Sequence, residues 1–420
     1  MIYYSENGLE KGLDRDRVRN ALETVIGSFG DRKKVVILPP DITRAHSGAG
    51  MITELLWERL GERVTDILPA LGTHVPMDAG EIGRMFGKVP HSIFREHRWR
   101  TDIEELGRVP SSFISEVTGG RLTFDYPVQV NRLLSSGGHD LIISVGQVVP
   151  HEVTGMANYN KNVFVGCGGS EAINKSHFIG AVHGIENILG TTDNPVRAVL
   201  NKASELAASR LPLLYILTVV APDREGKLKI RGLFAGDDIE CFRQAAALSR
   251  ELNFTTLPER LKKVVVWLDP EEFKSTWLGN KSIYRTRMAI ADNGELVVLA
   301  PGVKTFGEDP AIDRLIRKYG YRTTPEILAF TDANDDLKEN LSAAAHLIHG
   351  SPENRFRVTY AAGHLSASEV ESVGYSYGDI NELMKRYDPI SLQTGFHRLA
   401  DGEEFYFISN PATGLWKAAT

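Results

Sequence analysis

The chain has 420 residues, enough for two or three domains, and it is 42% hydrophobic and 24% charged, as soluble globular proteins usually are. Its net charge of -6 and isoelectric point near 6.1 give no electrostatic reason to expect a nucleic-acid or membrane partner. Two cysteines exclude a disulfide framework and favour a reducing cytoplasm. The first residues lack the layout of a signal peptide, and the apolar stretch 211–222 is too short to cross a bilayer as a helix.

The first strand, turn and helix carry a candidate anion site. The apolar run 34–38 predicts a strand, and apolar residues spaced over 52–60 predict a helix behind it. Between them lie Asp41, Thr43 and Arg44. Free N–H groups at a helix start bind anions, and a guanidinium grips a carboxylate with two parallel hydrogen bonds. A local alternative, in which Asp41 caps the helix and pairs with Arg44, remains open on this pattern.

Two further loops carry candidate residues. Residues 64–70 predict a second strand, and Gly72, Thr73 and His74 follow it. A glycine and a small hydroxyl at a strand end suit a phosphate or ribose contact, although His74 equally suits a structural hydrogen bond. His97 follows an irregular stretch and is unremarkable by itself.

The loop after the apolar run 141–145 holds the richest chemistry. It presents His151, Lys161 and His177 among four glycines, which let the backbone approach a ligand closely. Two imidazoles and an amine can supply a metal ligand, a general base and a covalent tether. The structural alternative is that these side chains are hydrogen-bonded or solvated in an ordinary loop.

The pattern of this loop resembles the nickel-pincer lactate racemase family. The resemblance is carried by Pro150-His151-Glu152-Val153, Gly155, Lys161, Gly166 and Ser176-His177. It implies that His151 is catalytic, that Lys161 is joined to the cofactor through a thioamide, and that His177 ligates nickel.

The same resemblance extends to the earlier loops. It implies that Arg44 binds the substrate carboxylate and that His97 is the second catalytic histidine, although Arg98 stands where an Asp is expected. The remaining cofactor-binding residues that it implies are Asp41, Thr43, Gly72, Thr73 and His74.

The implied cofactor is a nickel-bearing pyridinium mononucleotide, which the chain receives from the enzymes that make it. The implied activity is racemisation or epimerisation at C2 of a small 2-hydroxy carboxylic acid by reversible hydride transfer. Asn158, Tyr159 and Asn160 replace a run of small residues, so a longer hydroxylated acid such as an aldonate is an option beside a lactate-like one.

The second half predicts another α/β unit. A first domain is expected over 1–258 and a second over 262–390, with strands at 264–268 and 296–299 around a helix of roughly 20 residues. Lys281 falls there at the position that the resemblance gives to a substrate-holding lysine. Residues 391–420 are expected to return to the first domain. The fold class predicted is α/β, two domains with parallel-type sheets and an active-site cleft between them.

Two alternatives from other classes stay open. His97, His151 and His177 are also a possible zinc set of a mononuclear metal hydrolase, which leaves Lys161 unexplained. A non-catalytic carboxylate-binding protein needs neither His97 nor His151. A third group, His346, His349 and His364, lacks a completing carboxylate or cysteine, so a structural role is preferred for it.

Overall fold

The computed structural model describes residues 1–7, 10–223, 225–412 and 414–419, and the chain divides into two compact units. Unit 1 comprises residues 1–179 and 187–253, and unit 2 comprises residues 180–186 and 254–420. The end of unit 1 lies close to the boundary expected near 258. No helix within the described ranges is long and apolar enough to span a membrane.

Unit 1 contains a six-stranded sheet in which four neighbouring strands pair in parallel and two more strands, β10 and then the edge strand β1, are added on one side by antiparallel pairing. In spatial order its strands are β1 (Ile2–Glu6), β10 (Leu228–Gly236), β9 (Leu213–Pro222), β6 (Leu141–Gln147), β2 (Val35–Leu38) and β3 (Val64–Ile67). Every residue of β2 and β6 is buried, as expected of strands covered on both faces. Two short antiparallel pairs accompany the sheet: β4 (Ile103–Val109) with β5 (Tyr126–Asn131), and β7 (Pro150–His151) with β8 (Gly155–Met156).

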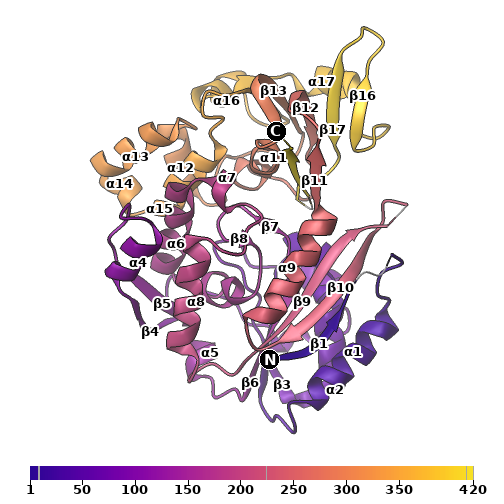
Figure 1. Ribbon diagram of the computed structural model, residues 1–420, viewed down its shortest axis with the longest axis vertical. Coiled ribbons are helices and arrows are strands. Elements are labelled where there is room, and N and C mark those ends of the chain that lie inside the picture. Colours follow the sequence, from indigo (N-terminus) through magenta and orange to yellow (C-terminus); the bar gives the residue numbers. More distant parts are fainter. Residues whose placement is uncertain (8–9, 224, 413, 420) are drawn as a thin grey trace. The chain divides into compact units, whose positions relative to one another are not determined.

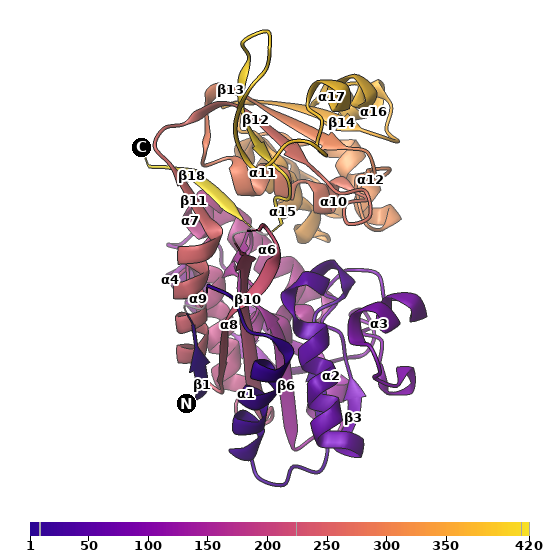
Figure 2. The same cartoon turned by 90° about the vertical axis from the view of Figure 1, so that its right-hand side faces the viewer.

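Helices cover both faces of this sheet. One face carries α1 (Arg15–Gly27) and α2 (Ala49–Leu60), whose apolar residues pack with β2, β3 and β6, whereas α9 (Ile239–Asn253) packs on β9 and β10 (Figure 2). The other helical segments of this part of the chain are η1 (Ile42–Ser47), η2 (Gly61–Arg63), α3 (Ala79–Phe86), η3 (His91–Ile93), α4 (Ser111–Val117), α5 (Arg132–Ser136), the π-helix η4 (Asn162–Gly166), α6 (Ser170–His183), α7 (Ile185–Ile188) and α8 (Pro195–Ala207) (Figure 1). The helix predicted from residues 52–60 is therefore present as α2.

The strand order of unit 1 reverses between β2 and β6. The chain passes from β2 to β3 on one side, and β6 then adds on the other side of β2. Two parallel strands that flank such a reversal leave a crevice at their carboxyl ends, where open α/β folds bind ligands. The loops that leave these two ends begin at Pro39 and Val148, so the Asp41 and His151 loops start at one place in the fold.

Unit 2 has a six-stranded sheet of the same kind. In spatial order its strands are β15 (Ser376–Tyr377), β14 (Arg357–Ala362), β13 (Ile290–Ala300), β12 (Leu261–Trp267), β17 (Glu404–Ile408) and the antiparallel edge strand β16 (Gly395–Arg398). Its helices are α10 (Thr276–Gly279), α11 (Lys281–Thr286), α12 (Pro310–Tyr319), α13 (Thr324–Ala333), α14 (Asp335–Lys338), α15 (Leu341–Gly350), α16 (Ala367–Ser372) and α17 (Ile380–Arg386). Its parallel order agrees with the predicted fold class.

Two expectations about unit 2 differ from the structure. The long helix expected between β12 and β13 is divided into α10 and α11 at Gly279 and Asn280. A Cβ at Gly279 would lie 2.5 Å from the Tyr360 hydroxyl, so close packing, not helix propensity, decides the residue here.

The tail 391–420 lies in unit 2 instead of returning to the first domain. Strand β17 pairs in parallel with β12, and Phe405 and Phe407 pack against Val265 and Leu299 in the core. The last strand, β18 (Leu415–Ala418), pairs with β11 (Phe254–Leu257) in a separate two-stranded sheet. Burial of these aromatic side chains against β12 explains why the tail pairs here.

Candidate functional site

The segment 162–169 connects the loops of unit 1. The Asn162 amide donates to the Leu38 carbonyl and to the Ser144 hydroxyl, both at 3.2 Å, and so ties the π-helix η4 to the ends of β2 and β6. The Gly72 N–H donates to the Gly166 carbonyl at 2.8 Å. Further along, the carbonyls of residues 167 and 168 accept from the Asn131 N–H and the His97 imidazole. The structure thus brings the loops after β2, β3 and β6 together. π-Helical turns are rare and occur frequently at functional sites.

Asp41 organises the loop after β2. It caps η1, accepts from the Thr43 N–H at 3.0 Å and from the Thr43 hydroxyl, and bonds His74 Nδ1 at 2.5 Å. Burial by itself raises the pKa of Asp41, but the charge and hydrogen bond of His74, with Thr43 and Arg44, lower it to about 2. Asp41 therefore bears a negative charge that joins the first two predicted loops, and Arg44 lies close enough to act on it electrostatically.

Lys161 immediately precedes the π-helix. Burial lowers the pKa of its ammonium group to about 8, helped by the positive charge of Arg44 and opposed by Glu152 and Asp41. A larger neutral fraction makes an amine a better nucleophile at neutral pH. The charge interactions also show that Lys161, Arg44 and Asp41 lie in one group, as their shared assignment to the cofactor and substrate requires.

His177 belongs to the same group. Its Nδ1–H donates to the Ile173 carbonyl one helical turn back, at 2.7 Å, which leaves Nε2 as the lone-pair nitrogen. Burial, together with the positive charge of Lys161, lowers the pKa of the imidazole to about 4, so the ring is neutral at pH 7. A neutral imidazole whose other N–H is held by a backbone carbonyl is the form that binds metals.

His151 is buried at the start of the same loop. Its Nδ1 accepts from the backbone N–H groups of Val153 and Thr154 at 3.1 and 3.4 Å, and its Nε2 lies 3.9 Å from the Glu152 carboxylate. Because Nδ1 accepts, the neutral ring carries its proton on Nε2. Glu152, named above only as part of the motif, also acts electrostatically on Lys161 and His177.

His97 is held from both sides by the protein. Its Nε2 donates to the Gly168 carbonyl at 3.0 Å, and its Nδ1 accepts from the Asn131 amide at 3.0 Å. Burial lowers the pKa of His97 to about 4. His97 is therefore linked to the central segment through residue 168, and a role as base requires the release of one of these two hydrogen bonds.

Lys281 lies in unit 2 as the first residue of α11. It is buried, with its ammonium 5.6 Å from the centre of the Phe273 ring. The aromatic residue of the preceding turn, Trp277, stacks on His346 with ring centres 4.4 Å apart.

The polar run 158–160 serves the interior of unit 1. The Asn160 amide donates to Asn201 and Ser204, and its oxygen accepts from Arg197. Tyr159 packs between Tyr215 and Phe242. Two of the three side chains taken as a sign of a longer substrate, those of Tyr159 and Asn160, therefore contact α8, β9 and α9.

Arg197 was not singled out from the sequence. It is 1% exposed, donates to the Met156 carbonyl at 2.6 Å, and lies 4.4 Å above the Phe242 ring. The sequence could have indicated Arg197, because it stands among the apolar residues on the buried face of α8, and a charged side chain on such a face needs partners.

The described residues contain no group of three or more His, Cys, Asp or Glu side chains placed to hold a metal ion. His97, His151 and His177 do not converge as the zinc alternative requires. A cofactor that brings its own donor atoms needs one imidazole and an attachment point, and His177 Nε2 and the Lys161 amine fit those needs.

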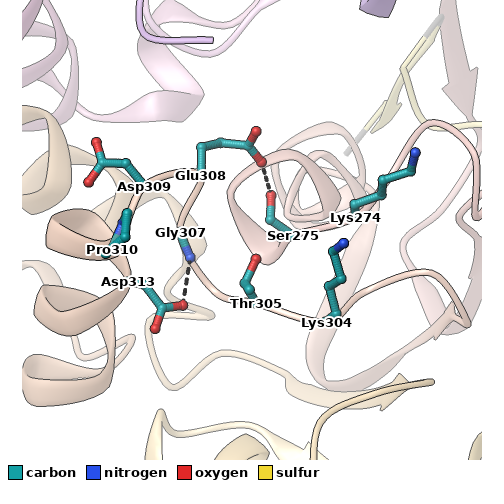
Figure 3. Close-up of a pocket in the computed structure, with 9 residues that line it drawn as sticks. All are labelled: Lys274, Ser275, Lys304, Thr305, Gly307, Glu308, Asp309, Pro310 and Asp313. Carbon is teal, nitrogen blue, oxygen red and sulfur yellow. Dashed lines mark hydrogen bonds between the residues drawn. The ribbon is translucent and has the colours of Figure 1, made fainter. Parts of the chain in front are cut away.

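Two cavities, one in unit 1 and one in unit 2, are not lined by Lys161 or His177. One, of about 420 Å³, is lined by Arg95, Arg98 and Asn131 among others. The other, of about 370 Å³, lies at the ends of β12 and β13, and its acids are engaged locally: Glu308 accepts from Ser275, and Asp313 accepts from the Gly307 N–H (Figure 3).

Comparison with known families identifies the first part of the chain. Residues 7–188 match the lactate racemase N-terminal domain. Over these residues the chain is similar to the lactate racemase family. The matched range contains every site residue predicted in unit 1, from Asp41 to His177.

Solved structures extend the likeness in fold to both units. A protein from Thermotoga maritima is 24% identical, with a TM-score of 0.85 over 98% of this chain and 100% of that one. The lactate racemase apoprotein from Thermoanaerobacterium thermosaccharolyticum is 17% identical, with a TM-score of 0.71 over 96% and 92%. At these identities the likeness shows the fold, and no curated protein matches the sequence. The domain match over residues 7–188 supports a racemase-type function.

Proposed function

We propose that the protein is a racemase or epimerase that inverts C2 of a 2-hydroxy carboxylic acid with a nickel-pincer nucleotide cofactor. The observation that carries the proposal is that Lys161 and His177 belong to one electrostatic group. The pKa of Lys161 is lowered to about 8, and the Nε2 atom of His177 is left as the lone-pair nitrogen. An amine that can be acylated and a neutral imidazole are the two attachment points such a cofactor uses.

The residues of unit 1 divide into three roles under this proposal. Lys161 and His177 hold the cofactor, with the Asp41–His74 pair and the Gly72–Thr73 turn at its nucleotide part. When bound, that group supplies a hydride acceptor for C2 of the substrate. Arg44 binds the substrate carboxylate, and Lys281 of unit 2 is the second cation proposed for it.

His151 and His97 are the proposed bases for the two enantiomers. One histidine takes the proton of the C2 hydroxyl of one enantiomer while C2 becomes a planar 2-oxo carbon, and the other donates a proton to the C2 oxygen when the opposite face is reduced. For His151 this requires Nδ1 to give up the hydrogen bonds that it accepts from two backbone N–H groups. Both N–H groups point at the same nitrogen, so each of these bonds is weak.

Isotope labelling tests this chemistry. C2-deuterated substrate should react more slowly and keep most of its deuterium in the product, because the hydrogen moves as hydride and does not mix with solvent protons. The measurement is mass spectrometry of recovered product after partial turnover in H₂O. Rapid loss of deuterium to water would mean direct proton abstraction and would exclude the hydride route.

Arg44→Lys tests substrate binding. An ammonium cannot reproduce the two parallel bonds of a guanidinium, so kcat/KM should fall by about 10²-fold while the protein remains folded. Arg98→Lys is the matched control, because the Arg98 side chain is 63% exposed and only weakly paired. Equal kcat/KM for Arg44→Lys and wild type would remove Arg44 from the site.

A further inference from the structure

The side chain of Gln147 is a polar group that the roles above do not use. It is the last residue of β6, it is 4% exposed, and neither its amide oxygen nor its amide nitrogen has a hydrogen-bond partner among the residues that the structure describes. Leaving a buried donor and acceptor unpaired is costly, and nearly all such groups in native proteins have partners. The amide therefore calls for a partner that is not a side chain or backbone group of the chain.

The strand register places Gln147 at the proposed site. In β6 the residues that alternate with it, such as Val145, face the core beneath α1 and α2, so Gln147 faces that side too. Its register partner on β9 is Thr218, whose hydroxyl donates to the Ser47 carbonyl at the end of η1 at 2.8 Å. Gln147 thus lies under the helix that carries Arg44.

On its other side, Gln147 is level with Asp41. Leu38 of β2 pairs with Ser144 of β6, and three further residues along each chain lead to Asp41 and Gln147. A Cβ built on Gly146 would lie 3.6 Å from Pro40 Cδ. The segments that follow β2 and β6 therefore remain adjacent beyond the last paired residues. Gln147 therefore stands in the crevice between β2 and β6, where the strand order reverses.

The two atoms of the amide restrict the chemistry of the partner. A carboxylate or phosphate only accepts, so it would satisfy the amide nitrogen and leave the oxygen unpaired. A hydroxyl group both donates and accepts, so it can donate to the amide oxygen of Gln147 or accept from its amide nitrogen. We propose that Gln147 binds a hydroxyl group of the ligand, and that this residue selects hydroxylated ligands at the racemase site.

This inference rests on the proposed function, and two sources of the hydroxyl fit it. One is the carbon chain of a polyhydroxylated 2-hydroxy acid, and the other is the ribose of the mononucleotide. The probes are therefore D-gluconate, L-lactate and nicotinic acid mononucleotide, each added to the full-length chain produced without the cofactor-making enzymes. Gluconate has hydroxyls beyond C2, lactate has none, and the mononucleotide has a ribose.

The test compares wild type with Gln147→Met, which keeps the size of the side chain and removes both polar atoms. Its midpoint of thermal unfolding without ligand should be equal to or above that of wild type, because an unpaired amide has been removed. Its Kd by calorimetry should rise about tenfold or more for one hydroxylated probe. Loss confined to gluconate assigns Gln147 to the substrate chain, and loss confined to the mononucleotide assigns it to the ribose.

Thr218→Val is the matched control in the same row of the sheet. It removes the bond to the Ser47 carbonyl, so it should lower the unfolding midpoint while the Kd values stay within twofold of wild type. If Gln147→Met is not folded, Gln147→Asn, whose amide is one methylene shorter, should show the same loss of binding.

The inference is overturned if the Gln147 variants bind all three probes as wild type does, since the amide would then be satisfied by resident water. It is also overturned if wild type binds none of them. A wild type that binds the probes through Gln147 but fails to invert C2 when loaded with cofactor would instead overturn the proposed function alone.

Discussion

Units 1 and 2 are built on the same plan, and they differ in what their buried polar groups contact. Both have a sheet of parallel strands with antiparallel strands at an edge. In unit 2, His346 is bonded through Nδ1 to Tyr284 and through Nε2 to Tyr321, at 2.7 and 2.9 Å. In unit 1, Lys161 and His177 are both buried, and the positive charge of Lys161 helps to lower the pKa of His177.

The contrast separates a polar core from a site. Around His346 the donors and acceptors match, so the network stabilises the fold. Around Lys161, burial and the like charge of Arg44 disfavour the charged ammonium, which costs stability unless a ligand or a reaction uses the amine. Substitutions in unit 1 should therefore change chemistry most, and those in the His346 network should change stability alone.

The largest expected effect is the loss of Lys161. Lys161→Ala should lower turnover by about 10³-fold or more and should lack the mass of one sulfur-modified mononucleotide when co-produced with the cofactor-making enzymes. Intact-mass spectrometry and a turnover assay measure the two effects. Lys175→Ala, which removes an ammonium bonded to Glu171 on α6, is the control and should keep both. An unmodified Lys161 in active, nickel-replete protein would contradict the covalent link.

Removal of the Arg197 guanidinium should have the next largest effect, on stability. Arg197→Ala leaves the Asn160 amide oxygen without its donor in the interior and removes one of the two donors to the Met156 carbonyl, so the free energy of unfolding should fall by about 3 kcal/mol. Urea denaturation followed by circular dichroism measures it. Arg210→Ala removes an exposed partner of Glu104 and should cost less than about 1 kcal/mol. Equal losses for the two variants would show that the Arg197 contacts are not formed.

Asp41→Asn should remove part of the acid sensitivity of the fold. The pKa of Asp41 is about 2 in the folded chain against 3.8 for an ordinary Asp, so its ionised form stabilises the fold above pH 4 and the gain is lost as the pH falls toward 2. The gain is about 2 kcal/mol at most. The free energy of unfolding should therefore fall more between pH 6 and pH 3 in wild type than in the variant. Asp335→Asn, at a side chain that is 91% exposed, should leave this pH dependence unchanged.

The smallest effect is expected in the His346 network. Tyr321→Phe removes a hydroxyl that contacts both His346 and Thr276, so the free energy of unfolding should fall by about 1–2 kcal/mol. Turnover per folded molecule should stay at the wild-type value. A fall in kcat without a fall in stability would show that the His346 network of unit 2 takes part in catalysis. The contrast between the two units would then no longer hold.

Local sequence patterns determined much of the fold and the main loop of the site. Apolar runs gave β2, β6 and β12 because a strand covered on both faces needs continuous apolar side chains. The loop with His151, Lys161 and His177 was recognisable because its residue types and spacing resemble the family, and the domain match covers the same residues.

Only the tertiary structure decided which polar residues are free for chemistry. Asn160 and Lys161 are adjacent in the sequence, yet the first is bonded to Arg197 and the second has its pKa lowered by burial. The unpaired amide of Gln147 depends on β6 lying between β2 and β9. Pairing of distant strands sets burial and hydrogen-bond partners, and these long-range contacts are not encoded in the spacing of residues along one segment.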